Sequence, residues 1–267
     1  MNTHSTHPAL RVDAIDAITV LTLDRPDARN PLSEATLHTV TEALDQIAQD
    51  RSIRAVVLAS TGPVFCAGHD LKEMSARRTD PDRGRAYFVD ILGRCSTMMQ
   101  KIVRLPQPVI AAVEGVATAA GCQLVASCDL AVAGESAEFC TPGVHIGLFC
   151  STPMVALSRN LGRKHAMEML LTGDRIKASE AARMGLVNRV VEKGAAFNEA
   201  MNMATLIAAK SPATIAIGKR AFYAQAEMTL EDAYRYASNV MVENMLARDA
   251  EEGIGAFIEK RTPNWTN

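Results

Sequence analysis

The chain has 267 residues, 48% of them hydrophobic, and a net charge of -2 with only 4% aromatic residues. It is long enough to bury a large core, and its weak negative charge excludes the basic surface typical of nucleic-acid binding. Six cysteines without a C-x-x-C pair predict reduced thiols, with no disulfide and no metal site. We therefore expect a cytoplasmic protein whose partner is a small molecule.

Neither the polar N-terminal residues nor the most apolar stretch of the chain predicts a secretory or membrane protein. Residues 1–9 are largely polar and are expected to form a flexible tail, because no apolar segment of a signal peptide follows them. The most apolar long stretch, residues 115–134, contains Gln123 and Asp129. A stretch interrupted in this way predicts buried core and no membrane span.

Strands and helices alternate along the first two thirds of the chain. The expected strands are residues 18–23, 55–59 and 108–113, and the expected helices begin after Ser33, near Lys72 and at about Ala120. This alternation favours an α/β fold.

After Ser151 the pattern becomes almost entirely helical. The expected helices are 154–161, 164–171, 178–184, 195–210, 212–225, 230–247 and 251–260, with one strand at 186–191. The sequence thus predicts a core at residues 10–200 and a helical C-terminal region at residues 201–267.

Two segments combine a buried strand, a glycine-containing turn and a helix start, namely residues 65–72 and 115–123. The first N–H groups of a helix have no partner within it and carry the positive end of its dipole. If the turns face each other, the N–H groups of His69 and Ala120 can bind one oxygen as it becomes an oxyanion, at about 3 kcal/mol per donor. The alternative is a pair of tight turns without chemistry.

These segments occur with further motifs, and together they closely resemble the crotonase superfamily of enoyl-CoA hydratases and isomerases. The further motifs are residues 25–32, 127–133, 170–176, 181–187 and 252–261. Gly68-His69-Asp70, with residues 119–129, 141–144 and 147–153, look most like the branch called enoyl-CoA hydratase domain-containing protein 3. The resemblance implies a crotonase-like spiral of ββα units, followed by helices that build a homotrimer or a dimer of trimers. It also implies an acyl-CoA thioester as the substrate, with coenzyme A as part of that substrate and no permanently bound cofactor.

The resemblance also assigns positions to the acid and base of hydratases, and this chain departs from the family at both. Family hydratases carry glutamates where this chain has Gln123 and Gly143. A glutamate transfers protons, an effect of about 10²–10⁴ in rate, whereas a glutamine only holds water by hydrogen bonds. The second oxyanion donor, usually glycine, is Ala120, whose methyl group is expected in the acyl pocket.

Two histidines are candidates to replace the absent glutamates. His145 follows Gly143 by two residues and titrates near neutral pH; the alternative is a packed structural residue. Some decarboxylases of the superfamily also carry Gly-His-Asp without the glutamate pair, which gives His69 a second claim. The alternative for His69 is a side chain that only lines the pocket while the backbone acts.

By resemblance, a third set of residues would contact the coenzyme and the acyl group. These residues are Ala28, Ala67, Asp70, Leu71, Lys72, Ala117, Pro142, Phe257 and Lys260. Lys72 would lie near the phosphates or be a surface cation, and Asp70 is expected to cap the following helix. Phe257 and Lys260, spaced i, i+3 on one helical face, match positions that reach a neighbouring subunit's coenzyme. The alternatives are Phe257 in the core and Lys260 on the surface.

Three functions fit these residues. The first is an enzyme of the hydratase/isomerase family that stabilises a thioester enolate with altered proton-transfer groups. The second is a malonyl-CoA-type decarboxylase that uses the oxyanion hole. The third is a non-catalytic acyl-CoA binding protein.

Overall fold

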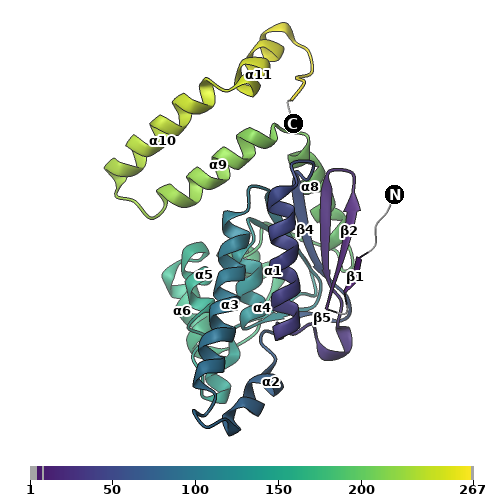
Figure 1. Ribbon diagram of the computed structural model, residues 1–267, viewed down its shortest axis with the longest axis vertical. Coiled ribbons are helices and arrows are strands. Elements are labelled where there is room, and N and C mark those ends of the chain that lie inside the picture. Colours follow the sequence, from purple (N-terminus) through teal and green to yellow (C-terminus); the bar gives the residue numbers. More distant parts are fainter. Residues whose placement is uncertain (1–4, 8, 266–267) are drawn as a thin grey trace.

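A seven-stranded sheet forms the centre of the computed structural model, which describes residues 5–7 and 9–265 (Figure 1). Its strand order is β1-β2-β3-β4-β6-β8-β11. These strands are β1 (Ser5–His7), β2 (Leu10–Ile15), β3 (Ile18–Leu23), β4 (Ala55–Ser60), β6 (Val109–Val113), β8 (Leu130–Gly134) and β11 (Arg189–Val191). The first three pair antiparallel, and β3 to β11 pair in parallel.

A second sheet of four strands has the order β10-β9-β7-β5. Its members are β5 (Val64–Cys66), β7 (Val116–Thr118), β9 (Glu138–Cys140) and β10 (Ile176–Lys177). Successive strand pairs, β4-β5, β6-β7 and β8-β9, each give one strand to each sheet before the chain turns into helix: α2 (Leu71–Ala76) and α3 (Arg85–Arg104), α4 (Ala120–Ser127), and the 3-10 helix η3 (Pro142–Ile146). This repeat is the expected α/β spiral of ββα units.

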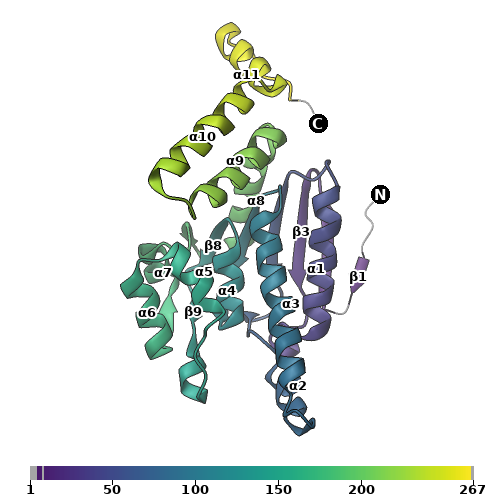
Figure 2. The same ribbon diagram turned by 60° about the vertical axis from the view of Figure 1, so that its left-hand side comes forward.

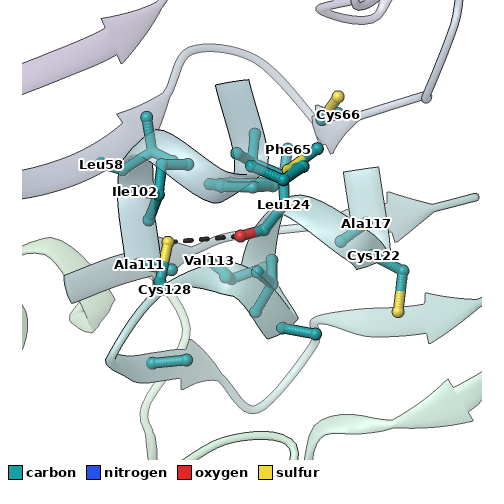
Figure 3. Packing of buried hydrophobic residues seen from close by; sticks show 14 of the residues in the cluster. Leu58, Phe65, Cys66, Ile102, Ala111, Val113, Ala117, Cys122, Leu124 and Cys128 are labelled. Atoms are coloured by element: carbon teal, nitrogen blue, oxygen red, sulfur yellow. Dashed lines mark hydrogen bonds between the residues drawn. The ribbon is translucent and has the colours of Figure 1, made fainter. Parts of the chain in front are cut away.

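Alternate side chains of the large sheet point to opposite faces, and helices pack against both faces. Val56 and Leu58 of β4 belong to the main core, covered by α1 (Glu34–Gln49), α3 and α4, which lie side by side in Figure 2. Figure 3 shows Leu58, Ile102 and Leu124 in this cluster, with the Cys128 thiol bonded to the Leu124 carbonyl at 3.3 Å. Val57 belongs to a second cluster, covered by α8 (Ala196–Ala208).

The last three helices form an arm that projects from this body (Figures 1 and 2). We call α9 (Pro212–Gln225), α10 (Leu230–Met245) and α11 (Arg248–Glu259) the C-terminal arm. Neither α9 nor α10 has a buried residue. The boundary expected at residue 200 falls inside α8, which packs on the sheet along Ala196, Ala200 and Ala204, so the change of architecture follows Lys210.

Three further helices, α5 (Pro153–Asn160), α6 (Arg163–Thr172) and α7 (Ala178–Met184), lie close to their expected bounds. The strand expected at 186–191 is shorter, since Leu186 and Val187 are buried in the core and only Arg189–Val191 pair with β8. The last helix ends at Glu259. Lys260 follows it in the left-handed region, with φ 56°, so the expectation that Lys260 shares a helical face with Phe257 is wrong.

The expected N-terminal tail includes a strand. Residues 5–7 form β1, paired with β2, whereas Met1–His4 and Pro8 of the expected tail lie outside the described residues. The apolar stretch 115–134 forms β7, α4 and β8 within the body. Within residues 5–7 and 9–265, no helix is long and apolar enough to cross a membrane. All six cysteines are free and buried.

Candidate acyl-thioester site

Two turns meet at the edge of the small sheet. The neighbouring strands β5 and β7 run in parallel, with Cys66 opposite Ala117, so both strands end at the same edge before turning into α2 and α4. Gly68 has φ 82°, and a Cβ atom built on it would lie 3.1 Å from the Ala120 nitrogen. The turns therefore face each other, as the sequence analysis required.

Glycine and a buried asparagine make this close approach possible. A Cβ atom on Gly121 would collide with the carbonyl oxygen of Cys66, so α4 can begin against the end of β5 only with glycine there. Asn30 is 1% exposed and donates to the carbonyls of Thr61 and Val64, both at 2.8 Å. These bonds fix the loop that leads into β5.

The N–H groups of His69 and Ala120, which we call the amide pair, point to no other backbone acceptor. Within residues 5–7 and 9–265, neither group donates a backbone hydrogen bond. The neighbouring Ala119 N–H, by contrast, donates to Cys140 at 2.9 Å. Asp70 caps α2, as expected, by accepting from the amides of Lys72 and Glu73. With the positive end of α4 behind it, the amide pair suits one oxygen of rising negative charge.

The turn before α4 holds a strained residue that the sequence analysis missed. Ala119 has φ 51° and ψ -119°, a combination that side-chain-bearing residues rarely adopt and that costs about 1–3 kcal/mol. Ala120 is 2% exposed. Its methyl group therefore packs within the main core, and its place in an acyl pocket stays a prediction.

His69 is half-buried as a residue, but the polar atoms of its imidazole are covered. Its two ring nitrogens are buried and have no hydrogen-bond partner within the described residues. Burial lowers the pKa of His69, and the nearby backbone of Leu32 offsets this only in part. A neutral imidazole offers one donor and one acceptor, so His69 can hold a polar group of a ligand beside the amide pair.

The two positions at which the sequence analysis expects the glutamates of hydratases, Gln123 and Gly143, differ in the space that they offer. Gln123 is 4% exposed, and its Oε1 has no partner within the described part of the chain. A Cβ atom on Gly143 would lie 2.8 Å from the Leu148 oxygen and 2.9 Å from the Cys150 sulfur. The loop after η3 thus fills the place of a side chain at Gly143, and no carboxylate fits there unless the loop moves.

His145 lies on the surface, with its ring against another helix. Its side chain is exposed, and a Cβ atom on Gly173 would lie 2.9 Å from its Nε2. Gly173 ends α6. The imidazole therefore packs at the C-terminus of α6.

The residues expected along the coenzyme path differ in exposure. Ala28, Leu71, Lys72, Phe257 and Lys260 are exposed, Ala67, Asp70 and Pro142 are half-buried, and Ala117 is fully buried. Phe257 is 84% exposed, so its alternative assignment to the core is wrong. Leu71 and Lys72 form the first turn of α2, directly beside His69.

An ion pair that was not predicted from the sequence joins the arm to the body. Lys219 of α9 donates to Asp129 at 2.6 Å and to the carbonyls of Ile102 and Gln107 at 3.0 Å. Tyr223 donates to the other oxygen of Asp129 at 2.9 Å. We call this group the Asp129 latch. Its only sequence signal is an aspartate between a buried helix and a buried strand.

The two-sheet spiral and its facing turns define a crotonase-type protein, and comparison with known proteins identifies the family. The family model described as "Enoyl-CoA hydratase/isomerase" matches residues 13–267. The chain therefore belongs to the enoyl-CoA hydratase/isomerase family.

Similar proteins include the branch that the motifs indicated. The chain is 45% identical over 252 residues to rat "Enoyl-CoA hydratase domain-containing protein 3, mitochondrial", covering 94% of this chain and 82% of the relative. The crystal structure of the human protein of that name has a TM-score of 0.91 and 43% identity, covering 96% of this chain and all of the other, 100%. An enoyl-CoA hydratase from Mycobacterium smegmatis has a TM-score of 0.92 and 52% identity, covering 97% and 99%.

These relatives correct one expectation. The rat, mouse and human proteins are named mitochondrial, so the assignment to the cytoplasm is wrong. That assignment rested on composition, and reduced thiols and a mild net charge do not distinguish between the two compartments.

Proposed function

We propose that this protein binds acyl-CoA thioesters and stabilises the thioester oxygen as an enolate with the backbone amides of His69 and Ala120. The observation that carries the proposal is the close approach of the two turns: a Cβ atom built on Gly68 would lie 3.1 Å from the Ala120 nitrogen. This approach brings two unbonded N–H groups to adjacent strand ends. Donors fixed in this way need no reorganisation when charge develops, and each contributes about 3 kcal/mol.

Hydration of an enoyl thioester is expected to be weak or absent. Water addition needs a group that takes and returns a proton, and Gln123 stands at the one position of the glutamate pair that has room for a side chain. The Gln123 amide can hold a water molecule by hydrogen bonds but does not titrate. His145, on the surface against α6, would need the loop to move before it could replace a glutamate.

Decarboxylation of a malonyl-type thioester is the second candidate, and the covered ring nitrogens of His69 favour it. In this reaction the bond between the α-carbon and the carboxylate breaks, and its electron pair forms the enolate held by the amide pair. Carbon dioxide leaves, and the α-carbon then takes a proton from water. A neutral His69 N–H can orient the departing carboxylate without neutralising it.

Three measurements on one preparation test these functions. Calorimetric titration with crotonyl-CoA and malonyl-CoA measures binding, loss of the enone absorbance measures hydration, and labelled carbon dioxide measures decarboxylation. Binding without hydration supports the proposal. Carbon dioxide release selects the second candidate, and binding with no product selects a non-catalytic acyl-CoA binding protein. Absence of binding contradicts all three.

A Gln123→Glu variant sharpens the hydration test. It restores a carboxylate beside the amide pair at a buried position, where burial raises the pKa of a glutamate toward neutral pH. We expect the variant to gain crotonyl-CoA hydration over the natural protein. Gly143→Glu is unsuitable as a companion because Leu148 and Cys150 occupy the space that its side chain needs.

We also propose that the protein forms homotrimers, alone or stacked in pairs. The C-terminal arm supports this proposal because it exposes large apolar side chains, among them Phe222 at 65%, Leu246 at 78% and Phe257 at 84%. Light scattering coupled to size-exclusion chromatography measures the mass. A Leu246→Glu variant is expected to lower it, whereas a monomeric natural protein would contradict the proposal.

A further inference from the structure

The groups that surround the thioester site are covered by the protein itself. Ala120, which carries one amide of the pair, is 2% exposed. The ring nitrogens of His69 and the Oε1 atom of Gln123 are buried and have no hydrogen-bond partner within the described residues. The acyl group of a thioester cannot lie against these atoms while they are covered. Part of the chain beside them must therefore move when such a ligand binds.

The segment that follows His69 has few contacts with the body. It consists of α2 and the 3-10 helix η2 (Arg77–Thr79), and neither helix has a buried residue. Met74 packs against the main core, and Glu73 accepts from the Glu34 amide at 3.1 Å. Figures 1 and 2 show α2 at the end of the body that lies opposite the C-terminal arm. This segment can thus move with little loss of packing.

Two arginines of η2 attach the segment to α1 and α3. The Nη2 atom of Arg77 lies 3.8 Å from Oε1 of Glu34, and its guanidinium carbon lies 4.9 Å from the centre of the Tyr87 ring. Arg78 lies over the ring of Phe88 at 5.9 Å. The Arg77 and Glu34 side chains are 48% and 39% exposed. Ion pairs and cation–π contacts at exposed sites are weak, so these contacts close the segment without fixing it.

The residues just before α2 are held by the body, which places the hinge after His69. The Leu32 amide donates to the Gly68 carbonyl at 2.8 Å, and Leu32 pairs with His69 in an isolated bridge. Asp70, by contrast, caps α2 through the amides of that helix and moves with it. The amide pair therefore keeps its geometry when α2 swings away.

We propose, on the basis of the function proposed above, that residues 71–79 form a lid that opens to admit the acyl group and is held closed by Arg77 against Glu34 and Tyr87. When the lid closes over a bound thioester it excludes water, which strengthens the hydrogen bonds to the thioester oxygen. Coenzyme A itself ends in a thiol and has no acyl group to place beneath the lid.

The test compares the natural protein with Arg77→Met, which removes both contacts of this guanidinium group. Surface plasmon resonance on the immobilised protein measures the association and dissociation rates of butyryl-CoA and of coenzyme A. The open lid should be about three- to tenfold more populated in the variant. Because binding through a lid is limited by the open population, both rates of butyryl-CoA should rise by this factor. The rates of coenzyme A should not change.

A matched variant and a second measurement locate the movement. Arg94→Met breaks an ion pair with Asp90 on α3 at a side chain that is also 48% exposed, and it should leave all rates unchanged. Hydrogen exchange followed by mass spectrometry needs no ligand. In Arg77→Met, exchange should become faster in residues 71–79 and stay unchanged in α4, which also shows that the variant is folded. Faster exchange in residues 143–150 without a change in residues 71–79 overturns the proposal.

The outcomes separate the lid from the function on which it rests. Absence of butyryl-CoA binding contradicts the proposed function, and the lid with it. Binding of butyryl-CoA with equal rates in the natural protein and Arg77→Met overturns the lid alone. An equal rise in the rates of butyryl-CoA and coenzyme A also overturns it, because the segment would then not distinguish the acyl group.

Discussion

The body and the C-terminal arm differ in how far they bury their apolar side chains. In the main core of the body, the large side chains of Leu58, Phe65 and Ile102 are at most 2% exposed. Along α9 and α10 no residue is buried, and Leu246 is 78% exposed. The body has a closed core although it also exposes apolar side chains such as Val89 and Leu206, whereas α9 and α10 have no core of their own and present a surface that another chain can cover.

The Asp129 latch is the main polar link between these two regions. Lys219 and Asp129 have side chains only 7% and 14% exposed, and the carboxylate also accepts from the Val109 amide at 2.7 Å. Burial lowers the pKa of Lys219, and Asp129 offsets part of this effect. Four predictions follow from the contrast between the two regions.

The largest effect is expected from breaking the latch. Lys219→Met leaves the Asp129 carboxylate buried without its cation, which should lower the free energy of unfolding by about 3–5 kcal/mol. Urea denaturation measures the change. Tyr223→Phe removes only one hydrogen bond and should cost about 1 kcal/mol. If both variants cost the same small amount, the latch does not hold the arm.

A matched pair of glycine substitutions compares packing in the two regions. Gly143→Ala in the body places a methyl group 2.8 Å from the Leu148 oxygen and should cost about 1–3 kcal/mol. In Gly218→Ala, in α9, the added methyl group meets nothing within 4 Å. This variant should raise the free energy of unfolding by about 1 kcal/mol, since alanine favours helix. Thermal unfolding of both variants measures the difference, and equal effects would contradict the contrast.

The covered ring nitrogens of His69 predict a dependence of stability on pH. Because burial lowers the pKa of His69 in the folded chain below its ordinary value of 6.5, the unfolded chain binds a proton that the folded chain does not between these two pKa values. Stability is therefore complete above pH 6.5 and falls as the pH decreases below it, by up to about 1.4 kcal/mol per unit. His69→Asn should flatten this slope, whereas His38→Asn, at an exposed side chain, should not.

The smallest effect is expected at Ala119. Glycine adopts its φ of 51° and ψ of -119° without a steric penalty, but it also raises the entropy of the unfolded chain. Ala119→Gly should therefore stabilise the protein by about 1 kcal/mol or less. Chemical denaturation measures this change, and a clear loss of stability would show that Ala119 carries no strain.

Local signals in the sequence predicted the parts of the fold that depend on neighbours along the chain. Ser33 and Asp70 cap their helices because capping acts within one turn, and the strand patterns located β3, β4 and β6. The oxyanion site was predicted on the condition that the two turns face each other. Two strand-turn-helix units can meet in this way only if their strands pair, and the sequence does not show that pairing.

The features that the sequence did not predict depend on contacts across the fold. Lys219 and Asp129 are 90 residues apart, so no local pattern in the sequence pairs them. The closed space at Gly143 depends on how Leu148 and Cys150 fold back. β11 is short because Leu186 and Val187 pack into the core and do not pair with β8. The apolar pattern of the sequence does not distinguish burial of this kind from strand pairing.

The central claim is that the amide pair stabilises an enolate, and acetoacetyl-CoA tests it most directly because its enolate absorbs light. At a pH where the free compound is mostly in the keto form, saturating protein should raise the enolate absorbance. Gly68→Ala places a methyl group against the Ala120 nitrogen and should abolish this rise, whereas Gly218→Ala should preserve it. Binding of acetoacetyl-CoA without any rise in enolate absorbance would contradict the account.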